Sequence, residues 1–343
     1  MHGGDIYRNN IKMDFSVSVN PLGVPEKIAE SLYGLQKELI CYPDFKSEEL
    51  IKRISAFHSI GEESVICGNG ASELFMAAVH AIKPKKAMVL VPSFSGYIHA
   101  LTAVSADIIY YYMKEENNFS LDSSVLDFID KTNDLDILFL ANPNNPVGNL
   151  IEEKLLENIL KMCRDKDIIL VLDECFIELS DKNKLSKVEK ITDYDNLLLV
   201  RAFTKSFAIP AIRLGYMVGS DIELLKKIRN NLPEWNVSLA AQRAGAAAFN
   251  TGTYLKDSRA LINTERGYMT DKLISMGIKV YPSETNFLLL KTDLQLYDEL
   301  LKKNILIRDC SDFLGLSKGY YRIAIKTHEE NEIFLRTIKE LIA

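Results

Sequence analysis

Short apolar runs, each followed by polar or glycine-rich residues, constrain the fold of this chain most strongly. Four of these runs are Met88–Val91, Ile137–Ala141, Ile168–Leu172 and Leu197–Val200. They are too short for helices, and stretches with helical periodicity lie between them. This alternation is typical of an α/β fold with a mainly parallel sheet that is buried on both faces. Because such sheets bind ligands beyond the carboxyl ends of their strands, the residues that follow each run are the first candidates for a site.

A lysine and an arginine follow the run Leu197–Val200, and both have small or apolar neighbours. Lys205 lies just past the run, and Arg213 comes eight residues later. A desolvated lysine becomes nucleophilic and forms a Schiff base with a carbonyl, whereas a guanidinium group suits a phosphate. The pair therefore suggests a cofactor with an aldehyde and a phosphate, which is pyridoxal 5′-phosphate. The alternative is that both side chains only extend from the edge of the core into water.

A glycine-rich turn lies between a predicted strand over Ser64–Cys67 and an apolar helix from Leu74 to Ile82. Its sequence is Gly68-Asn69-Gly70-Ala71-Ser72. Free amides at the start of a helix, together with the helix dipole, bind phosphate. The turn is neither a P-loop nor a complete GxGxxG motif, and a tight turn before a helix cap is the alternative.

Three further candidates follow other apolar runs. Phe94 comes after Met88–Val91, where an aromatic ring can lie against a ring cofactor. Asn145 belongs to a loop rich in turn residues after Ile137–Ala141. Asp173 ends an apolar strand, and a buried carboxylate needs a cationic or hydrogen-bonded partner. A protonated pyridine nitrogen would be such a partner.

The remaining pattern predicts how the chain is divided. Asp14–Asn20 alternates with period two and predicts a short strand before a Pro-Gly turn, and Glu26–Leu39 predicts a helix. After Pro233, long Ala-rich helical stretches precede short strands of an α+β unit. We therefore expect an N-terminal arm and helix over residues 1–39, a large cofactor-binding domain over 40–236 and a smaller C-terminal domain over 237–343.

Composition narrows the classes of function. A net charge of −6 gives no reason to expect nucleic acid or an anionic membrane as a partner. No apolar run approaches the length of a membrane span, and the first residues lack the features of a signal peptide. The five scattered cysteines have no CxxC spacing, so we expect reduced thiols, no metal site and a cytoplasmic protein.

In their order along the chain, these motifs resemble those of the fold-type I pyridoxal-phosphate enzymes of the aspartate aminotransferase superfamily. Within it, the likeness is greatest to the threonine-phosphate decarboxylases of cobalamin biosynthesis, with the histidinol-phosphate aminotransferases as near relatives. The resemblance covers the whole chain. It implies a homodimer with pyridoxal 5′-phosphate and a small phosphorylated amino acid as substrate.

The resemblance also implies roles for individual residues. Lys205 would form the Schiff base, Asp173 would pair with the pyridine nitrogen, and Asn145 would bind the phenolate oxygen of the ring on which Phe94 stacks. The residues implied to hold the cofactor phosphate are Ala71, Ser72, Thr204, Arg213 and, from the other subunit, Tyr42. The implied substrate residues are Arg322 for the carboxylate, Arg308 and His2 for the phosphate, and Asn20.

Two positions depart from the aminotransferase pattern. Phe176 stands where those enzymes have a tyrosine, and Ala202 stands where a phosphate-binding Ser or Thr is usual. The resemblance implies that the decarboxylases accept phenylalanine at this position, which favours decarboxylation of L-threonine O-3-phosphate to (R)-1-aminopropan-2-yl phosphate. Transamination of histidinol phosphate or a related amino acid is the alternative. A non-enzymatic sensor domain of a transcription regulator is disfavoured, because it would need a basic DNA-binding module in front.

Overall fold

The computed structural model describes residues 3–342 and contains a seven-stranded sheet, called here the large sheet. Its strand order is β2-β8-β7-β6-β5-β3-β4, and only β8 runs antiparallel to its neighbours. This confirms the predicted α/β class with a mainly parallel sheet. The strands are β2 (Val65–Gly68), β3 (Lys86–Val91), β4 (Asp107–Tyr112), β5 (Ile137–Ala141), β6 (Ile169–Asp173), β7 (Leu197–Ala202) and β8 (Gly215–Val218).

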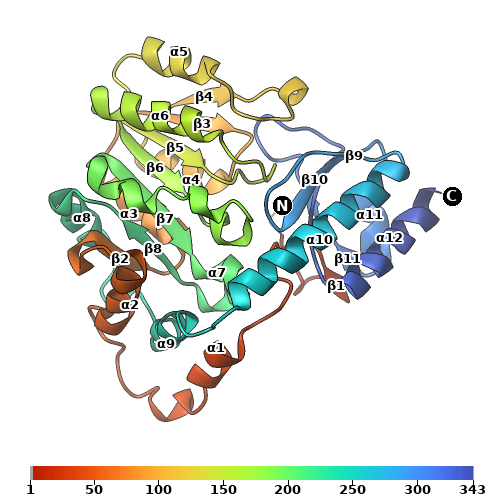
Figure 1. The fold of residues 1–343 in the computed structure, drawn as a ribbon, viewed down its shortest axis with the longest axis horizontal. Coiled ribbons are helices and arrows are strands. Elements are labelled where there is room, and N and C mark those ends of the chain that lie inside the picture. The colour runs from red at the N-terminus through yellow and green to blue at the C-terminus, as the bar shows by residue number, and fades with distance from the viewer. Residues whose placement is uncertain (1–2, 343) are drawn as a thin grey trace.

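Helices cover both faces of the large sheet (Figure 1). On β6, Leu170 and Leu172 belong to one apolar core and Val171 to the other, so successive side chains are buried on opposite faces. This explains why the strands appear in the sequence as unbroken apolar runs. One face packs against α3 (Ala71–Ile82), α4 (Ser95–Ala103) and α8 (Ile222–Arg229). The other packs against α2 (Glu48–His58), α5 (Ser124–Lys131), α6 (Glu153–Asp165) and α9 (Leu239–Ala248).

A four-stranded antiparallel sheet, called here the small sheet, lies beside the large one (Figure 1). Its order is β12 (Arg308–Asp309), β13 (Tyr320–Ala324), β10 (Phe287–Lys291) and β9 (Lys279–Val280). Its outer face forms a third apolar core with α10 (Tyr254–Ser275), α11 (Leu296–Lys302) and α12 (His328–Ile342). Its inner face carries Leu289, which belongs to a core of the large sheet. The domain boundaries inferred above stay predictions.

The N-terminal segment joins the small-sheet side of the molecule. β1 (Met13–Asp14) pairs in parallel with β11 (Ile305–Leu306). The strand predicted over Asp14–Asn20 is shorter than expected, because the Ser16 amide donates to Asp14 Oδ1 at 2.8 Å and turns the chain. The helix predicted to reach Leu39 is α1 (Glu26–Ser31), and Gly34, with φ at 75°, separates it from a short 3₁₀ turn.

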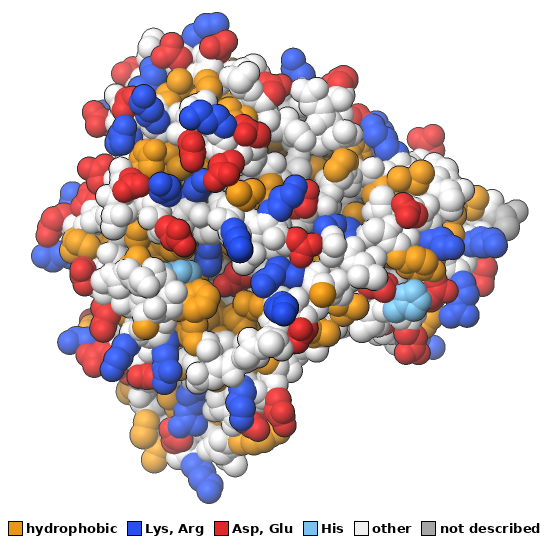
Figure 2. Space-filling view, in the orientation of Figure 1, with side chains coloured by type: hydrophobic (Ala, Val, Ile, Leu, Met, Phe, Trp, Pro, Cys, Tyr) orange, Lys and Arg blue, Asp and Glu red, His pale blue; other side chains and the backbone are white. Residues whose placement is uncertain are grey.

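Edge strand β4 does not follow the apolar-run pattern. Its residues Asp107–Tyr112 are partly buried or exposed, whereas all four residues of the other edge strand, β2, are buried. Charged side chains of both signs are interspersed over the face of the molecule seen in Figure 2. Within residues 3–342, no helix has the length and hydropathy that crossing a bilayer would require.

Candidate active site

A cavity of about 250 Å³ lies where the carboxyl ends of the large-sheet strands meet the small sheet. It brings together residues that are far apart in the sequence. The predicted site residues that line it are Ala71, Ser72, Phe94, Asn145, Asp173, Thr204, Lys205, Arg213, Arg308 and Arg322. The two departures from the aminotransferase pattern, Phe176 and Ala202, line it as well.

Lys205 lies in α7 (Phe203–Ser206), which begins directly after β7. Desolvation, together with the charges of Arg322 and Arg213, lowers the pKa of Lys205 to about 8. A neutral amine is the nucleophilic form of a lysine, and a pKa near neutrality increases the fraction of lysine in this form. The position of Lys205 therefore fits attachment of an aldehyde.

Asp173 ends β6 and is only 9% exposed. Its Oδ2 accepts a hydrogen bond of 2.5 Å from the Tyr97 hydroxyl, and its Oδ1 accepts one of 2.8 Å from the Cys175 amide. Burial raises the pKa of Asp173, and within residues 3–342 no lysine or arginine forms an ion pair with it. The protonated ring nitrogen of pyridoxal phosphate is a cation of the kind that would stabilise the ionised carboxylate.

The start of α3 forms the end of the cavity that suits a phosphate. Gly70 has φ at 82°, and no side chain caps the helix. A Cβ atom on Gly70 would lie 2.7 Å from Arg213 Nη2, and one on Gly215 would lie 2.9 Å from the Ala71 amide nitrogen. Both glycines therefore allow Arg213 and β8 to approach the amino end of α3. With the Thr204 side chain beside them, a guanidinium group and helix amides form a site for an anion.

Two arginines project from the inner face of the small sheet. Arg322 on β13 and Arg308 on β12 lie opposite each other in register. The Arg322 guanidinium donates to Asn145 Oδ1 and, at 3.0 Å, to the Ser16 carbonyl, and burial lowers its pKa to about 10. Arg308 forms an ion pair of 2.7 Å with Asp312. The cavity thus holds a second pair of cations on the side away from α3.

Two of the predicted residues, Asn20 and Tyr42, do not line the cavity. Asn20 is buried, and its side chain donates to the Ser206 carbonyl at 2.8 Å and to the Ser258 hydroxyl at 2.7 Å, so it supports the turn that carries Lys205. Tyr42 is 79% exposed and packs against Trp235, with ring centroids 4.9 Å apart. His2 lies outside the described residues. The roles of these three stay predictions.

Two residues of the site, Tyr97 and Ser16, were not predicted from the sequence. Tyr97 lies in the first turn of α4, three residues after Phe94, and the two ring centroids are 5.6 Å apart, so its nearness to Phe94 in the sequence was a usable signal. The carbonyl of Ser16 meets Arg322 only because residues 306 apart in the sequence pack together. No local pattern indicates that contact.

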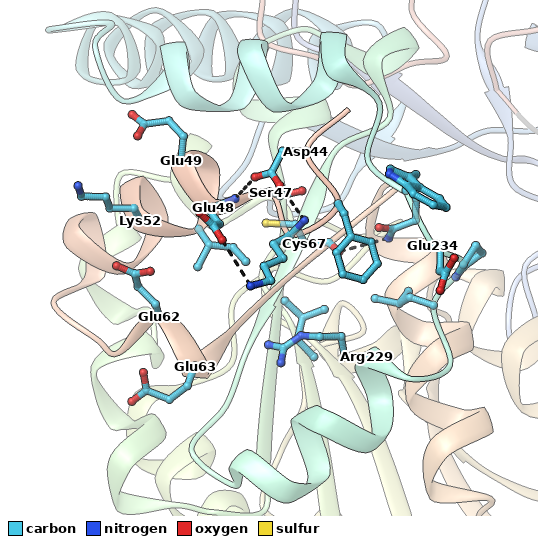
Figure 3. A pocket seen from close by; sticks show the side chains of 18 of the residues that line it. Asp44, Ser47, Glu48, Glu49, Lys52, Glu62, Glu63, Cys67, Arg229 and Glu234 are labelled. Atoms are coloured by element: carbon cyan, nitrogen blue, oxygen red, sulfur yellow. Dashed lines mark hydrogen bonds and ion pairs between the residues drawn. The ribbon is translucent and has the colours of Figure 1, made fainter. Parts of the chain in front are cut away.

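A larger cavity of about 1210 Å³ lies beside α2 (Figure 3). Charged side chains such as Glu49, Glu62, Glu63 and Arg229 surround it, and all four are exposed. Among residues 3–342, none of the predicted site residues lines it. By volume alone this cavity would be the first candidate for an active site, but the buried lysine and carboxylate that cofactor chemistry needs lie in the smaller one.

The comparisons with known proteins agree with this assignment. The sequence profile of the family Aminotransferase class I and II matches residues 10–338. The chain is 31% identical over 334 residues to threonine-phosphate decarboxylase of Salmonella typhimurium, covering 96% of this chain and 91% of that protein. It is 29% identical over 334 residues to histidinol-phosphate aminotransferase of Methanosphaera stadtmanae, covering 94% of this chain and 88% of that protein.

A solved structure agrees in fold. The crystal structure of histidinol-phosphate aminotransferase from Clostridium acetobutylicum matches with a TM-score of 0.89 and 32% identity, over 96% of this chain and 99% of that one. The profile match spans nearly the whole chain, and the cavity offers a lysine, a carboxylate and an anion site to one cofactor. The chain therefore belongs to the class I and II aminotransferase family and is a pyridoxal-phosphate-dependent enzyme.

Proposed function

We propose that this enzyme decarboxylates L-threonine O-3-phosphate to (R)-1-aminopropan-2-yl phosphate, a step of cobalamin biosynthesis. The likeness to the Salmonella decarboxylase supports this reaction. The observation that carries the proposal is the pair Arg308 and Arg322, which lie opposite each other on adjacent strands and both line the cavity.

The charges of the cavity favour a substrate with two anionic groups. Arg213 and the start of α3 suit the cofactor phosphate, so Arg308 and Arg322 are left for the substrate. Arg322 Nε is buried and has no hydrogen-bond partner among the residues described, so this donor is available to a carboxylate. Threonine phosphate has both a carboxylate and a phosphate, whereas histidinol phosphate has no carboxylate to offer Arg322.

Each residue then has a stated task. When bound, pyridoxal phosphate supplies an electron sink that weakens the bonds at the substrate's α-carbon. Arg322 holds the carboxylate so that the bond between the α-carbon and the carboxylate carbon breaks, rather than the bond between the α-carbon and its hydrogen. Asp173 keeps the ring nitrogen protonated, Asn145 donates to the ring oxygen, and Lys205 returns a proton to the α-carbon.

Phe176 supports the decarboxylase assignment through what it lacks. Its ring packs edge-on against Phe287, with centroids 5.1 Å apart, and offers no hydroxyl to the cavity. The ring oxygen of the cofactor would then have fewer donors than in an enzyme with tyrosine at this position. We expect this difference to alter how strongly the cofactor ring withdraws electrons from the substrate.

We also propose that the enzyme is a cytoplasmic homodimer. Tyr42, Phe45 and Trp235 form an exposed aromatic cluster beside the larger cavity, with exposed fractions of 79%, 56% and 42%. Aromatic side chains of this kind are enriched at protein interfaces. In a two-fold dimer, Tyr42 would reach the cofactor phosphate of the other subunit. Light scattering that finds a monomer with full cofactor occupancy would reject the shared site.

The reaction is tested by measuring carbon dioxide released from L-threonine phosphate by the purified holoenzyme. We expect release without any added 2-oxo acid, and little turnover of histidinol phosphate. The second candidate is an aminotransferase, which the likeness to the Clostridium acetobutylicum enzyme favours. Turnover of histidinol phosphate that depends on 2-oxoglutarate, without carbon dioxide, would assign the enzyme to that reaction.

A further inference from the structure

One end of the small sheet's inner face carries four polar side chains that converge on one point. Lys291 on β10 lies opposite both Lys279 on β9 and Tyr320 on β13. Tyr281 follows Lys279 by two residues, which places it on the same side of the chain. Two ammonium groups and two hydroxyl groups therefore gather at this end of the sheet.

The point of convergence is Glu115, in a 3₁₀ turn (Glu115–Asn117) that follows β4 of the large sheet. Its carboxylate accepts from Lys291 Nζ at 2.9 Å through each oxygen, and from Lys279 Nζ at 2.9 Å. The hydroxyls of Tyr281 and Tyr320 donate to it at 2.6 and 2.7 Å. The bonds from Lys291 and then from the two tyrosines hold the pKa of Glu115 well below its usual range. We call these five residues the Glu115 cluster.

Aromatic packing around Phe119 supports the Glu115 cluster. The buried ring of Phe119 lies against Tyr281 and Tyr320, with centroids 5.3 and 6.1 Å apart. Phe119 has φ at 55°, a left-handed conformation that costs free energy in a non-glycine residue and that this packing maintains. The Asn149 side chain donates to the Phe119 carbonyl at 3.0 Å. Asn149 belongs to the loop that carries Asn145, so the cluster is tied to the cofactor side of the cavity.

The substrate arginines lie on the same face of the small sheet as the Glu115 cluster. Tyr320 and Arg322 are two residues apart on β13, a separation of about 7 Å along a strand, and Arg308 lies opposite Arg322. We infer that Glu115 is a positioning residue: it ties the inner face of the small sheet to the large sheet and so fixes where Arg308 and Arg322 project over the cofactor site.

Replacement of Glu115 should affect the two sides of the cavity differently. The variant Glu115→Gln keeps the shape of the side chain but leaves Lys279 and Lys291 without their shared anion, so their repulsion loosens the junction. The arginines on the small sheet then lose their position. The cofactor residues Asp173, Lys205 and Arg213 belong to the large-sheet side, so cofactor binding should not change.

The experiment measures two affinities in full-length protein. One is the affinity for pyridoxal phosphate, measured by fluorescence. The other is the affinity of the holoenzyme for 3-phosphooxypropanoate, measured by calorimetry; this compound has the carboxylate and phosphate of threonine phosphate but lacks its amino and methyl groups. The matched control is Glu116→Gln, an exposed neighbour in the same turn.

We expect Glu115→Gln to raise the Kd for 3-phosphooxypropanoate by about 5-fold, and to change the Kd for the cofactor by less than about 2-fold. Glu116→Gln should leave both constants unchanged. An unchanged Kd for 3-phosphooxypropanoate in Glu115→Gln would overturn the inference. An equal weakening of both ligands would overturn it too, because it would indicate general destabilisation.

The inference about Glu115 rests on the proposed function. One further measurement distinguishes a failure of the proposed function from a failure of this inference. If the wild-type holoenzyme does not bind 3-phosphooxypropanoate, the proposed function fails. Amide hydrogen exchange over β13 then decides the role of Glu115 without any substrate. Faster exchange at Tyr320–Ala324 in Glu115→Gln than in Glu116→Gln supports the positioning role, and equal exchange rejects it.

Discussion

The two cavities of this molecule differ both in the sign of their charges and in how far those charges are exposed to water. The larger one, beside α2, is lined by six carboxylates and three cations, nearly all of them in contact with water (Figure 3). The smaller one holds four cations and one carboxylate, and burial shifts the pKa of Asp173, Lys205 and Arg322. Since water screens exposed charges, a few desolvated groups interact more strongly with a ligand than many hydrated ones do.

The largest effect should come from the lysine of the smaller cavity. We expect Lys205→Ala to lower kcat by about 10⁴-fold, because it removes the only residue proposed both to attach the cofactor and to transfer the proton. Borohydride reduction of the wild-type holoenzyme should attach pyridoxyl to Lys205 in a peptide map. Lys52→Ala, on the lining of the larger cavity, is the control and should retain activity. Label on a different lysine would contradict the cofactor assignment.

The next largest effect should come from the buried carboxylate. Asp173→Asn should still bind the cofactor but lower kcat by about 10²- to 10³-fold, because an amide does not stabilise the protonated ring nitrogen. The matched change in the larger cavity is Glu62→Gln, which should leave kcat unaltered. Wild-type rates in the Asp173 variant would show that this carboxylate is only structural.

A smaller loss is expected from the substrate arginine. Arg322→Ala should lower kcat/KM for threonine phosphate by about 10- to 100-fold, with both a higher KM and a lower kcat, because one contact would bind the carboxylate and orient the bond that breaks. Arg229→Ala provides the comparison in the larger cavity. A change in KM alone would mean that Arg322 binds the substrate without orienting it.

The smallest expected effect is the change with pH in the rate of cofactor attachment. Only the neutral amine reacts with an aldehyde, and desolvation lowers the pKa of Lys205 to about 8. The rate at which pyridoxal phosphate attaches to cofactor-free protein should therefore rise about tenfold from pH 7 to pH 9 and then level off, whereas an ordinary lysine, with a pKa of about 10.4, would still be rising. Stopped-flow absorbance measures this rate. A rate that continues to rise beyond pH 10 would contradict the desolvated environment.

Much of the fold could be predicted because its signal is local. Strands buried on both faces must be apolar throughout, so the runs that end at Ala141 and Asp173 identified central strands β5 and β6 correctly. The topology of parallel strands then gathered Lys205, Asp173 and Asn145 at one edge, as expected. Edge strand β4 did not follow the rule because it is only half buried.

The sequence by itself determined the α/β class, the family resemblance and the approximate positions of the central strands, because apolar periodicity and turn residues act over a few positions. Only the tertiary structure decided which groups meet. Tyr97 and Asp173 are 76 residues apart, and Arg322 and Asn145 are 177 apart. Such contacts depend on how whole sheets pack against each other, and side-chain hydrogen bonds are directional over a few tenths of an ångström. The position of Asn20 beneath Lys205 and the convergence of four donors on Glu115 arise in the same way.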